Sequence, residues 1–340
     1  MKILITGGCG FLGARLARAL LAQPDFSLAG AAPRTITQLI LADRMPPPAD
    51  LSADPRVRFI GGELLAQLAN GQLLTADTTL VYHLAAAVSG ECEADLELGL
   101  RSNMDTTLAL LQACRTLGTA PVFVFSSSVA VFGSTPEQPL PAVVEDHTLP
   151  TPQNSYGIQK FIGEQLVADF SRRGLVQGRN VRLMTVAVRP GQPNAAASSF
   201  LSGMLREPLA GQRARVPVAA DTPVALASPG RTVQGLLRAA QTSAAEWGAR
   251  TAVNLPALTT TVGAMAQALE DIAGPAATAL LDWEPDARIA AIVTAWPSRV
   301  HSARAAALGL LADASFNDIL REYVQENSGA VRLPLLEKHA

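Results

Sequence analysis

The sequence contains 340 residues, of which 49% are hydrophobic and 16% are charged. This length is sufficient for one large or two modest domains with a substantial buried core. Lysine and arginine number 27 against 29 acidic residues, so no strong field favours nucleic acid or an acidic membrane surface, and we expect a small-molecule partner instead.

Cysteine and histidine are scarce and scattered. Cys9, Cys92 and Cys114 are an odd number in a long chain, which argues against a disulfide framework and for a reducing compartment. The four histidines show no close ligand spacing, so we predict no metal site. An apolar stretch near the start carries Arg15 and Arg18, and we expect neither a signal peptide nor a membrane span. A cytoplasmic protein is the resulting expectation.

Short apolar segments alternate with helix-length amphipathic segments across the first half of the chain. The apolar segments have the composition of strands buried on both faces. They cover residues 2–6, 36–42, 57–61, 79–85, 121–127 and 181–188. Helix-length segments such as residues 11–23 and 95–118 lie between them. This alternation predicts an α/β fold with a Rossmann-type, doubly wound parallel sheet, whose ligands bind at the carboxyl ends of the strands.

The pattern changes after about residue 190. A short predicted strand at residues 214–218 is followed by mostly helical segments broken by glycine and proline. We therefore predict a cofactor-binding Rossmann domain at residues 1–190, a smaller, mostly helical substrate-binding lobe at 191–330 and a tail at 331–340. A helix beginning near Arg231 and a strand at 252–255 are expected to return to the main sheet.

A glycine-rich loop follows the first predicted strand directly. The segment TGGCGFLG places Gly7, Gly10 and Gly13 at three-residue intervals before an amphipathic helix, which is a dinucleotide-binding fingerprint in its required context. Gly7 permits the tight turn, Gly10 lets the backbone approach a pyrophosphate, and Gly13 allows close packing of helix on strand. Phe11 and Leu12 complete the expected cofactor loop. A purely structural turn is the alternative.

Asp43 ends the second predicted strand. A carboxylate there accepts hydrogen bonds from both ribose hydroxyls and repels a 2′-phosphate, so we expect NAD as the cofactor. Two observations leave NADP open: Arg44 follows immediately and suits a phosphate, and the interval from Gly13 is about ten residues longer than the usual spacing of roughly 20. A solvated turn residue is the alternative role for Asp43.

Serines and a tyrosine–lysine pair follow the fifth predicted strand. Tyr156 and Lys160 are four residues apart and share one face of a helix, so the ammonium can lie beside the phenol. We expect this cation to lower the pKa of Tyr156 from about 10, so that the phenolate accepts the proton of a substrate hydroxyl. Ser128 is expected to stabilise the charge that develops on the substrate oxygen. The alternative is a surface tyrosine with a solvated lysine.

In this order, TGGCGFLG, Asp43, HLAA, SSSVAVFG and YGIQK resemble the extended short-chain dehydrogenase/reductase family, which contains the NAD-dependent epimerases and dehydratases. The resemblance covers nearly the whole chain. It implies a catalytic set of Ser128, Tyr156 and Lys160 and a homodimer that pairs the helices at residues 95–107 and 156–170. The further cofactor contacts that it implies are Glu63, Leu64, Ala85, Asn103, Tyr156 and Lys160.

Longer segments, at residues 83–103, 188–211, 227–231 and 253–258, resemble a subgroup of this family that acts on a four-carbon sugar acid. The resemblance implies NAD-dependent oxidation of the C2 hydroxyl of D-erythronate to 2-dehydro-D-erythronate in sugar-acid catabolism. The substrate contacts that we expect are Ser89, Ser127, Ser128, Tyr156, Asn194, Ser198 and Arg206. Arg189 and Arg231 are the other arginines whose paired hydrogen bonds suit a carboxylate.

Two other functions fit the same residues. A sugar-nucleotide epimerase or a threonine-type dehydrogenase of this fold has the same proton and hydride chemistry. A non-catalytic NAD-sensing protein belongs to a different class, and it has no use for the base that Tyr156 and Lys160 provide. Substrate configuration depends on side-chain positions that the sequence does not give.

Overall fold

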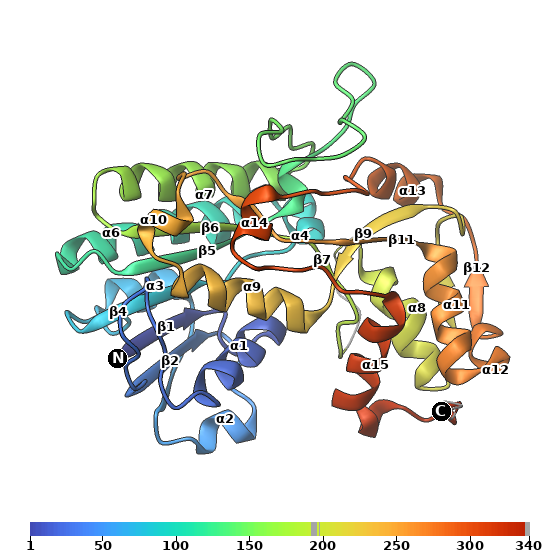
Figure 1. Ribbon diagram of the computed structural model, residues 1–340, viewed down its shortest axis with the longest axis horizontal. Coiled ribbons are helices and arrows are strands. Elements are labelled where there is room, and N and C mark those ends of the chain that lie inside the picture. The colour runs from blue at the N-terminus through green and yellow to red at the C-terminus, as the bar shows by residue number, and fades with distance from the viewer. Residues whose placement is uncertain (192–195, 197, 337–340) are drawn as a thin grey trace.

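The computed structural model describes residues 1–191, 196 and 198–336. Its main sheet has seven strands in the order β3–β2–β1–β4–β5–β6–β10, each parallel to its neighbours (Figure 1). The strands are β1 (Lys2–Thr6), β2 (Gln38–Asp43), β3 (Val57–Gly61), β4 (Thr78–His83), β5 (Val122–Ser128), β6 (Gln177–Leu183) and β10 (Val253–Asn254). The predicted doubly wound sheet is confirmed. Its strand order reverses between β1 and β4, which is where ligands bind in such sheets.

Helices cover both faces of this sheet (Figure 1), which explains why its central strands β1, β4 and β5 are almost completely buried. On one face, Ile3 packs in a core with Leu16 and Leu236, while on the other Leu4 packs with Phe125. The helices of this half are α1 (Phe11–Leu21), α2 (Ala49–Ala53), α3 (Leu64–Ala69), α4 (Ser89–Ala94), α5 (Leu96–Gly99), the π-helix η1 (Leu100–Asp105), α6 (Thr106–Leu117), the 3₁₀-helix η2 (Val129–Val131), α7 (Ser155–Arg172), α9 (Pro229–Gln241), α10 (Ala244–Trp247) and α14 (Ala303–Ala307). No helix in the described part of the chain is long and apolar enough to cross a membrane.

The second half of the molecule is a mostly helical lobe with its own core, in which Met204, Met265 and Leu320 are buried together. Its small sheets have the orders β11–β9–β7 and β12–β8. The strands are β7 (Thr185–Val186), β8 (Ala214–Val216), β9 (Pro223–Ala227), β11 (Leu258–Thr261) and β12 (Leu281–Trp283). The helices are α8 (Ser199–Leu209), α11 (Val262–Ala273), α12 (Pro275–Thr278), α13 (Ala287–Thr294), α15 (Phe316–Glu326) and the 3₁₀-helix η3 (Ser328–Ala330).

The chain passes between the two halves several times. The apolar stretch predicted as one strand at residues 181–188 is divided: β6 ends at Leu183 in the main sheet, and β7 pairs with β9 in the lobe. A continuous apolar stretch suits two adjoining sheets as well as one, so its composition does not mark the break. From the later sequence, β10 pairs with β6, and α9 packs against α1, β5 and β6. The domain boundary at residue 190 itself stays a prediction.

Candidate active site

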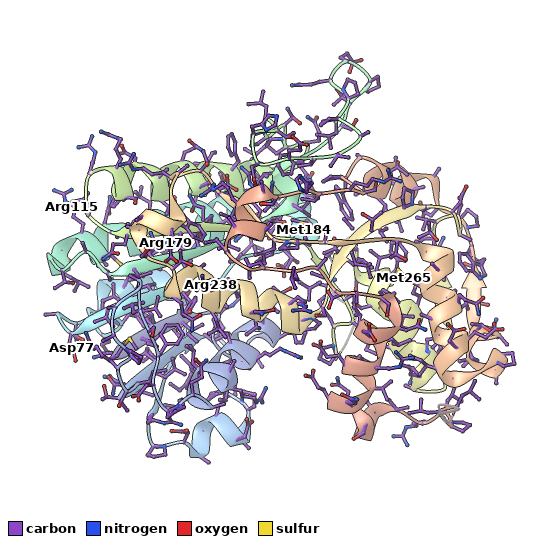
Figure 2. All side chains as sticks on the ribbon, viewed as in Figure 1. Asp77, Arg115, Arg179, Met184, Arg238 and Met265 are labelled. Atoms are coloured by element: carbon purple, nitrogen blue, oxygen red, sulfur yellow. The ribbon has the colours of Figure 1, made fainter. Side chains whose placement is uncertain are left out.

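A cavity of about 350 Å³ opens where the carboxyl ends of the central strands meet the lobe. Met184 lies on its wall, and Figure 2 shows this residue between the two halves of the molecule. The described residues that line the cavity are Gly7, Gly10, Phe11, Leu12, Gly13, Leu84, Ala86, Val88, Ser89, Ser126, Ser127, Ser128, Val129, Ala130, Asn154, Tyr156, Lys160, Leu183, Met184, Thr185, Val186, Arg189, Ala196, Ser198 and Trp296. This set contains two cations and no carboxylate.

The glycine loop has the shape that a dinucleotide requires. Gly7 has a φ of +68°, and a Cβ on Gly13 would lie 2.0 Å from the Gly7 oxygen, so both positions exclude a side chain. A Cβ on Gly10 would lie 3.4 Å from the Gly7 oxygen, which is an ordinary van der Waals contact, so packing within the protein does not require glycine at this position. Gly10 also precedes α1 without a side-chain cap, which leaves the first helical amides to phosphate oxygens. The residues present fit a bound NAD.

Asp43 holds the same loop through its carboxylate. Its Oδ2 accepts hydrogen bonds from the amides of Cys9 at 3.0 Å and Gly10 at 3.2 Å. Glu63 accepts two hydrogen bonds from Arg101, which lower the pKa of the Glu63 carboxyl. Asp43, Glu63 and the neighbouring Leu64 are not among the residues that line the cavity. Their predicted contacts with the cofactor remain predictions.

Asn103 is fully occupied by contacts within the protein. This buried side chain accepts a hydrogen bond from the Ala87 amide at 2.8 Å and donates to Gln159 Oε1 at 2.7 Å. It therefore ties the loop after β4, which contains Ala85, to α7. Neither Ala85 nor Asn103 lines the cavity. Ala85 lies under the glycine loop, since a Cβ on Gly7 would be 2.8 Å from the Ala85 nitrogen.

His83 connects these elements beneath the cavity. Its Nδ1 lies 2.7 Å from Thr6 Oγ1, and its Nε2 lies 2.9 Å from Thr107 Oγ1. Thr107 donates its own proton to the Asn103 carbonyl, so Nε2 must carry the imidazole proton and Nδ1 must accept. Burial, assisted by the charge of Lys160, lowers the pKa of His83 to about 3. The ring is therefore neutral and structural. Histidine, cysteine and acidic residues form no metal-binding group in the described part of the chain.

The three serines at the end of β5 have different partners. Ser126 donates to the His83 carbonyl at 2.9 Å, and Ser127 donates to the buried carboxylate of Glu164. Ser128 accepts a hydrogen bond from the Ala130 amide at 3.1 Å, and its hydroxyl interacts with the phenol of Tyr156. Among these three serines, Ser128 is thus the one whose hydroxyl acts on the pKa of Tyr156.

The start of α7 brings Tyr156 to this serine. Asn154 caps the helix by accepting from the Gly157 amide at 2.7 Å. A Cβ on Gly157 would lie 2.1 Å from the Ala130 oxygen, so glycine allows the first turn to pack directly on η2. One turn later, Lys160 donates to the Ser126 carbonyl at 2.8 Å, and its Nζ lies 5.6 Å from the centre of the Tyr156 ring. Ser128, Tyr156 and Lys160 all line the same cavity.

The expected direction of the Tyr156 pKa shift is wrong. Burial raises the pKa of Tyr156 to about 12, although the Ser128 hydrogen bond and the charge of Arg189 act in the opposite sense. Burial also lowers the pKa of Lys160 to about 8. The ammonium is itself desolvated and donates to a carbonyl, so it does not dominate the phenol as an exposed ion pair would.

Some of the predicted substrate contacts line the cavity in the structure, and others do not. Ser89 and Ser198 line the cavity with the serines of β5, whereas Arg206 does not. Arg206 is buried and donates to the Arg189 carbonyl at 2.8 Å. Arg231 lies on α9 and donates to Gln234, away from the cavity lining. Asn194 lies outside the described residues.

Two residues that line the cavity were not indicated by the sequence motifs. Trp296 follows α13 and reaches the cavity from the far end of the lobe sequence. Met184 occupies the break between β6 and β7. Met184 lies within the predicted strand at residues 181–188 and Trp296 lies in no predicted motif, so sequence reasoning assigned neither residue to the site.

Comparisons with known proteins cover nearly the whole chain. The family model described as "NAD dependent epimerase/dehydratase family" matches residues 3–232. The D-erythronate dehydrogenase of Cupriavidus necator is 47% identical over 326 residues, which are 96% of this chain and 98% of the relative. The D-erythronate dehydrogenase of Haemophilus influenzae is 39% identical over 325 residues, covering 96% and 99% of the two chains.

A solved structure shares the fold closely. It is described as the nucleoside-diphosphate-sugar epimerase from Agrobacterium tumefaciens, and it superimposes with a TM-score of 0.88 at 37% identity. The match covers 97% of this chain and 95% of that one. The descriptions of these relatives thus name two different activities.

Proposed function

We propose that this chain, which belongs to the NAD dependent epimerase/dehydratase family and is an NAD-dependent enzyme, acts on D-erythronate. The proposed reaction oxidises the C2 hydroxyl to give 2-dehydro-D-erythronate. The family, the enzyme class and NAD, all expected from the motifs, are confirmed by these matches. The observation that supports catalysis is that Ser128, Tyr156 and Lys160 share one cavity with the glycine loop. The two D-erythronate dehydrogenases at 47% and 39% identity support the choice of substrate.

In the proposed mechanism, Tyr156 accepts the proton of the C2 hydroxyl as the C2–H bond breaks and the carbonyl forms. NAD, when bound, would supply the hydride acceptor, and its positive charge would favour the phenolate. Ser128 donates a hydrogen bond to the substrate oxygen and keeps it in reach of the phenol. Lys160, fixed by the Ser126 carbonyl, offers its remaining N–H donors to the cofactor ribose.

The test is NADH formation from D-erythronate by the wild-type protein and by Tyr156→Phe. We expect the variant to lose roughly a hundredfold or more of kcat, because general-base catalysis contributes about 10²–10⁴-fold. Its dissociation constant for NAD should stay close to that of the wild type. Full activity in Tyr156→Phe would exclude this residue as the base. No turnover of D-erythronate by the wild type would exclude the substrate.

The second candidate is a nucleoside-diphosphate-sugar epimerase, because the solved relative at 37% identity carries that description. An epimerase would convert UDP-sugars without net NADH formation. A panel of UDP-sugars, threonine and D-erythronate therefore distinguishes these enzymes. A protein that binds NAD and acts on none of these substrates would favour the NAD-sensing alternative.

We also propose a cytoplasmic homodimer that pairs the helices at residues 95–107 and 156–170. Leu96 is 55% exposed and Ile158 is 45% exposed on these helices, and association would remove both from water. The three cysteines are free, which fits a reducing compartment. Light scattering should give a dimer mass that Leu96→Glu with Ile158→Glu reduces to a monomer. A monomeric wild type would exclude the dimer.

A further inference from the structure

Arg189 is a cavity-lining cation that pairs with no carboxylate among the residues that the structure describes. Two buried arginines are neutralised, since Arg182 pairs with Glu164 and Arg206 pairs with Glu207. Arg179 is also buried, and it donates to the main-chain carbonyls of Gly178 and Thr242. The guanidinium of Arg189 instead donates to Ser198 Oγ over 3.5 Å, a long and weak hydrogen bond. Arg189 thus lines the cavity with one weak hydrogen bond from its guanidinium to a described residue.

The surroundings of Arg189 favour a bound anion. Burial and the nearby charge of Arg206 both lower the pKa of Arg189, whereas the charge of Tyr156 acts in the opposite sense. The other cation of the cavity is Lys160, and no aspartate or glutamate is among its described lining residues. A partly desolvated cation in such a cavity gains most from a ligand that brings its own negative charge.

Helix α8 holds the main chain of Arg189 in place. Ser202 accepts a hydrogen bond from the Arg189 amide at 3.0 Å, and Arg206 donates to the Arg189 carbonyl at 2.8 Å. These two residues lie four positions apart, so they share one face of α8. Arg206, which the sequence suggested as a substrate contact, is in this arrangement a positioning residue for Arg189.

Arg189 lines the same cavity as Tyr156. Its positive charge acts on the phenol of Tyr156, and the charge of Tyr156 acts on it in return. An anion at Arg189 therefore shares the cavity with the proposed base. The short-chain substrate must carry its negative charge close to the carbon that is oxidised.

We infer that Arg189 binds the substrate carboxylate through paired hydrogen bonds and thereby makes the enzyme specific for 2-hydroxy carboxylates. This inference rests on the proposed function. In a 2-hydroxy acid, the carboxylate is attached directly to the reacting carbon, so anchoring it at Arg189 places the hydroxyl beside Tyr156. A 3-hydroxy acid places its hydroxyl one carbon further away and should react poorly.

The experiment compares D-erythronate with its neutral amide, D-erythronamide, in the wild type, Arg189→Gln and Arg189→Lys. Loss of two charge-assisted hydrogen bonds should lower kcat/KM of Arg189→Gln for the acid roughly a hundredfold or more. The value for the amide should change only a few-fold, so the discrimination between acid and amide disappears. Arg189→Lys should be intermediate, because it keeps the charge without the planar pair of donors.

Two further variants define the role. Arg206→Gln should raise KM for D-erythronate more than KM for the amide and leave KM for NAD unchanged, as a positioning role for Arg189 requires. Arg115→Gln is the matched control and should change nothing, because Arg115 lies on α6 at the opposite end of the main sheet from the lobe (Figure 2). An equal loss for acid and amide in Arg189→Gln would overturn the inference.

A binding measurement separates this inference from the proposed function. Glycerate and glyceramide are titrated into the enzyme–NADH complex, with NADH fluorescence as the signal. Tighter binding of glycerate that disappears in Arg189→Gln supports Arg189 even if D-erythronate is not turned over. If the wild type binds acid and amide equally, or binds neither, the assignment of Arg189 is wrong.

Discussion

Glu164 offers a sharp test of how the main sheet supports the site. Its carboxylate accepts hydrogen bonds from Arg182 at 2.8 and 2.7 Å and a further one from Ser127. The side chains of Glu164 and Arg182 are only 2% and 5% exposed. Glu164→Gln keeps the shape but leaves the guanidinium without a counter-ion. Removing one partner of a buried pair costs about 3–5 kcal/mol, so we expect the free energy of unfolding to fall by that amount.

Thermal unfolding gives the measurement. An unfolding entropy of about 2.1 cal/mol/K per residue amounts to roughly 0.7 kcal/mol/K for this chain, so Tm should fall by about 4–7 °C. The matched control is Asp50→Asn, which removes the ion pair with Arg18 on the surface, where the side chains are 55% and 48% exposed. That change should cost less than about 1 kcal/mol. If Glu164→Gln costs no more than Asp50→Asn, the reasoning about the buried pair is refuted.

Three further predictions concern the site. Lys160→Met removes a buried ammonium with a pKa of about 8 against 10.5 when unfolded. Between these pH values the unfolded wild type binds more protons than the folded wild type. The free energy of unfolding of the wild type, relative to that of the variant, should therefore rise with pH by on the order of 3 kcal/mol. Urea unfolding at several pH values measures this difference. A flat difference would contradict the burial of this charge. Gly13→Ala places a Cβ 2.0 Å from the Gly7 oxygen, so it should weaken NAD binding, measured by calorimetry, at least tenfold. The control Gly329→Ala, whose Cβ meets nothing within 4 Å, should bind NAD as tightly as the wild type. Asn154→Ala removes the cap of α7 and should cost about 1 kcal/mol; unchanged stability with unchanged kcat would show that the cap does not fix the site.

The fold was predictable because burial on both faces of the sheet leaves a clear pattern. The strands from β1 to β5 appear as apolar segments, and the expected end of the second strand at Asp43 coincides with the end of β2. The start of β6 was not predicted, because its first four residues, Gln177 to Asn180, are mostly polar. The break after Leu183 was not predictable, because the stretch stays apolar where the chain moves from one sheet to another. The strand at residues 252–255, which contains β10, was predicted from the sequence. Its pairing with β6 depends on contacts between residues far apart in the sequence.

The site was predictable where it depends on local spacing. Gly7, Gly10, Gly13, Tyr156 and Lys160 belong to short motifs, and the structure places all five around one cavity. The choice among arginines was not predictable, because it depends on how α8 packs against the segment after β7. The shift of the tyrosine pKa was not predictable either, since burial is a property of the folded molecule.

The repeated crossing of the chain bears on how the molecule can be engineered. Residues 228–255 contribute Val233, Leu236 and Leu255 to the core of the main sheet, although lobe strands precede and follow them. A chimaera that exchanges everything after β6 would therefore remove one edge and part of one face of the nucleotide-binding half. A transplant of substrate specificity must instead replace three separate segments, between β6 and α9, between β10 and α14, and after Leu310, because Ala305, Leu308 and Leu310 also belong to the core of the main sheet.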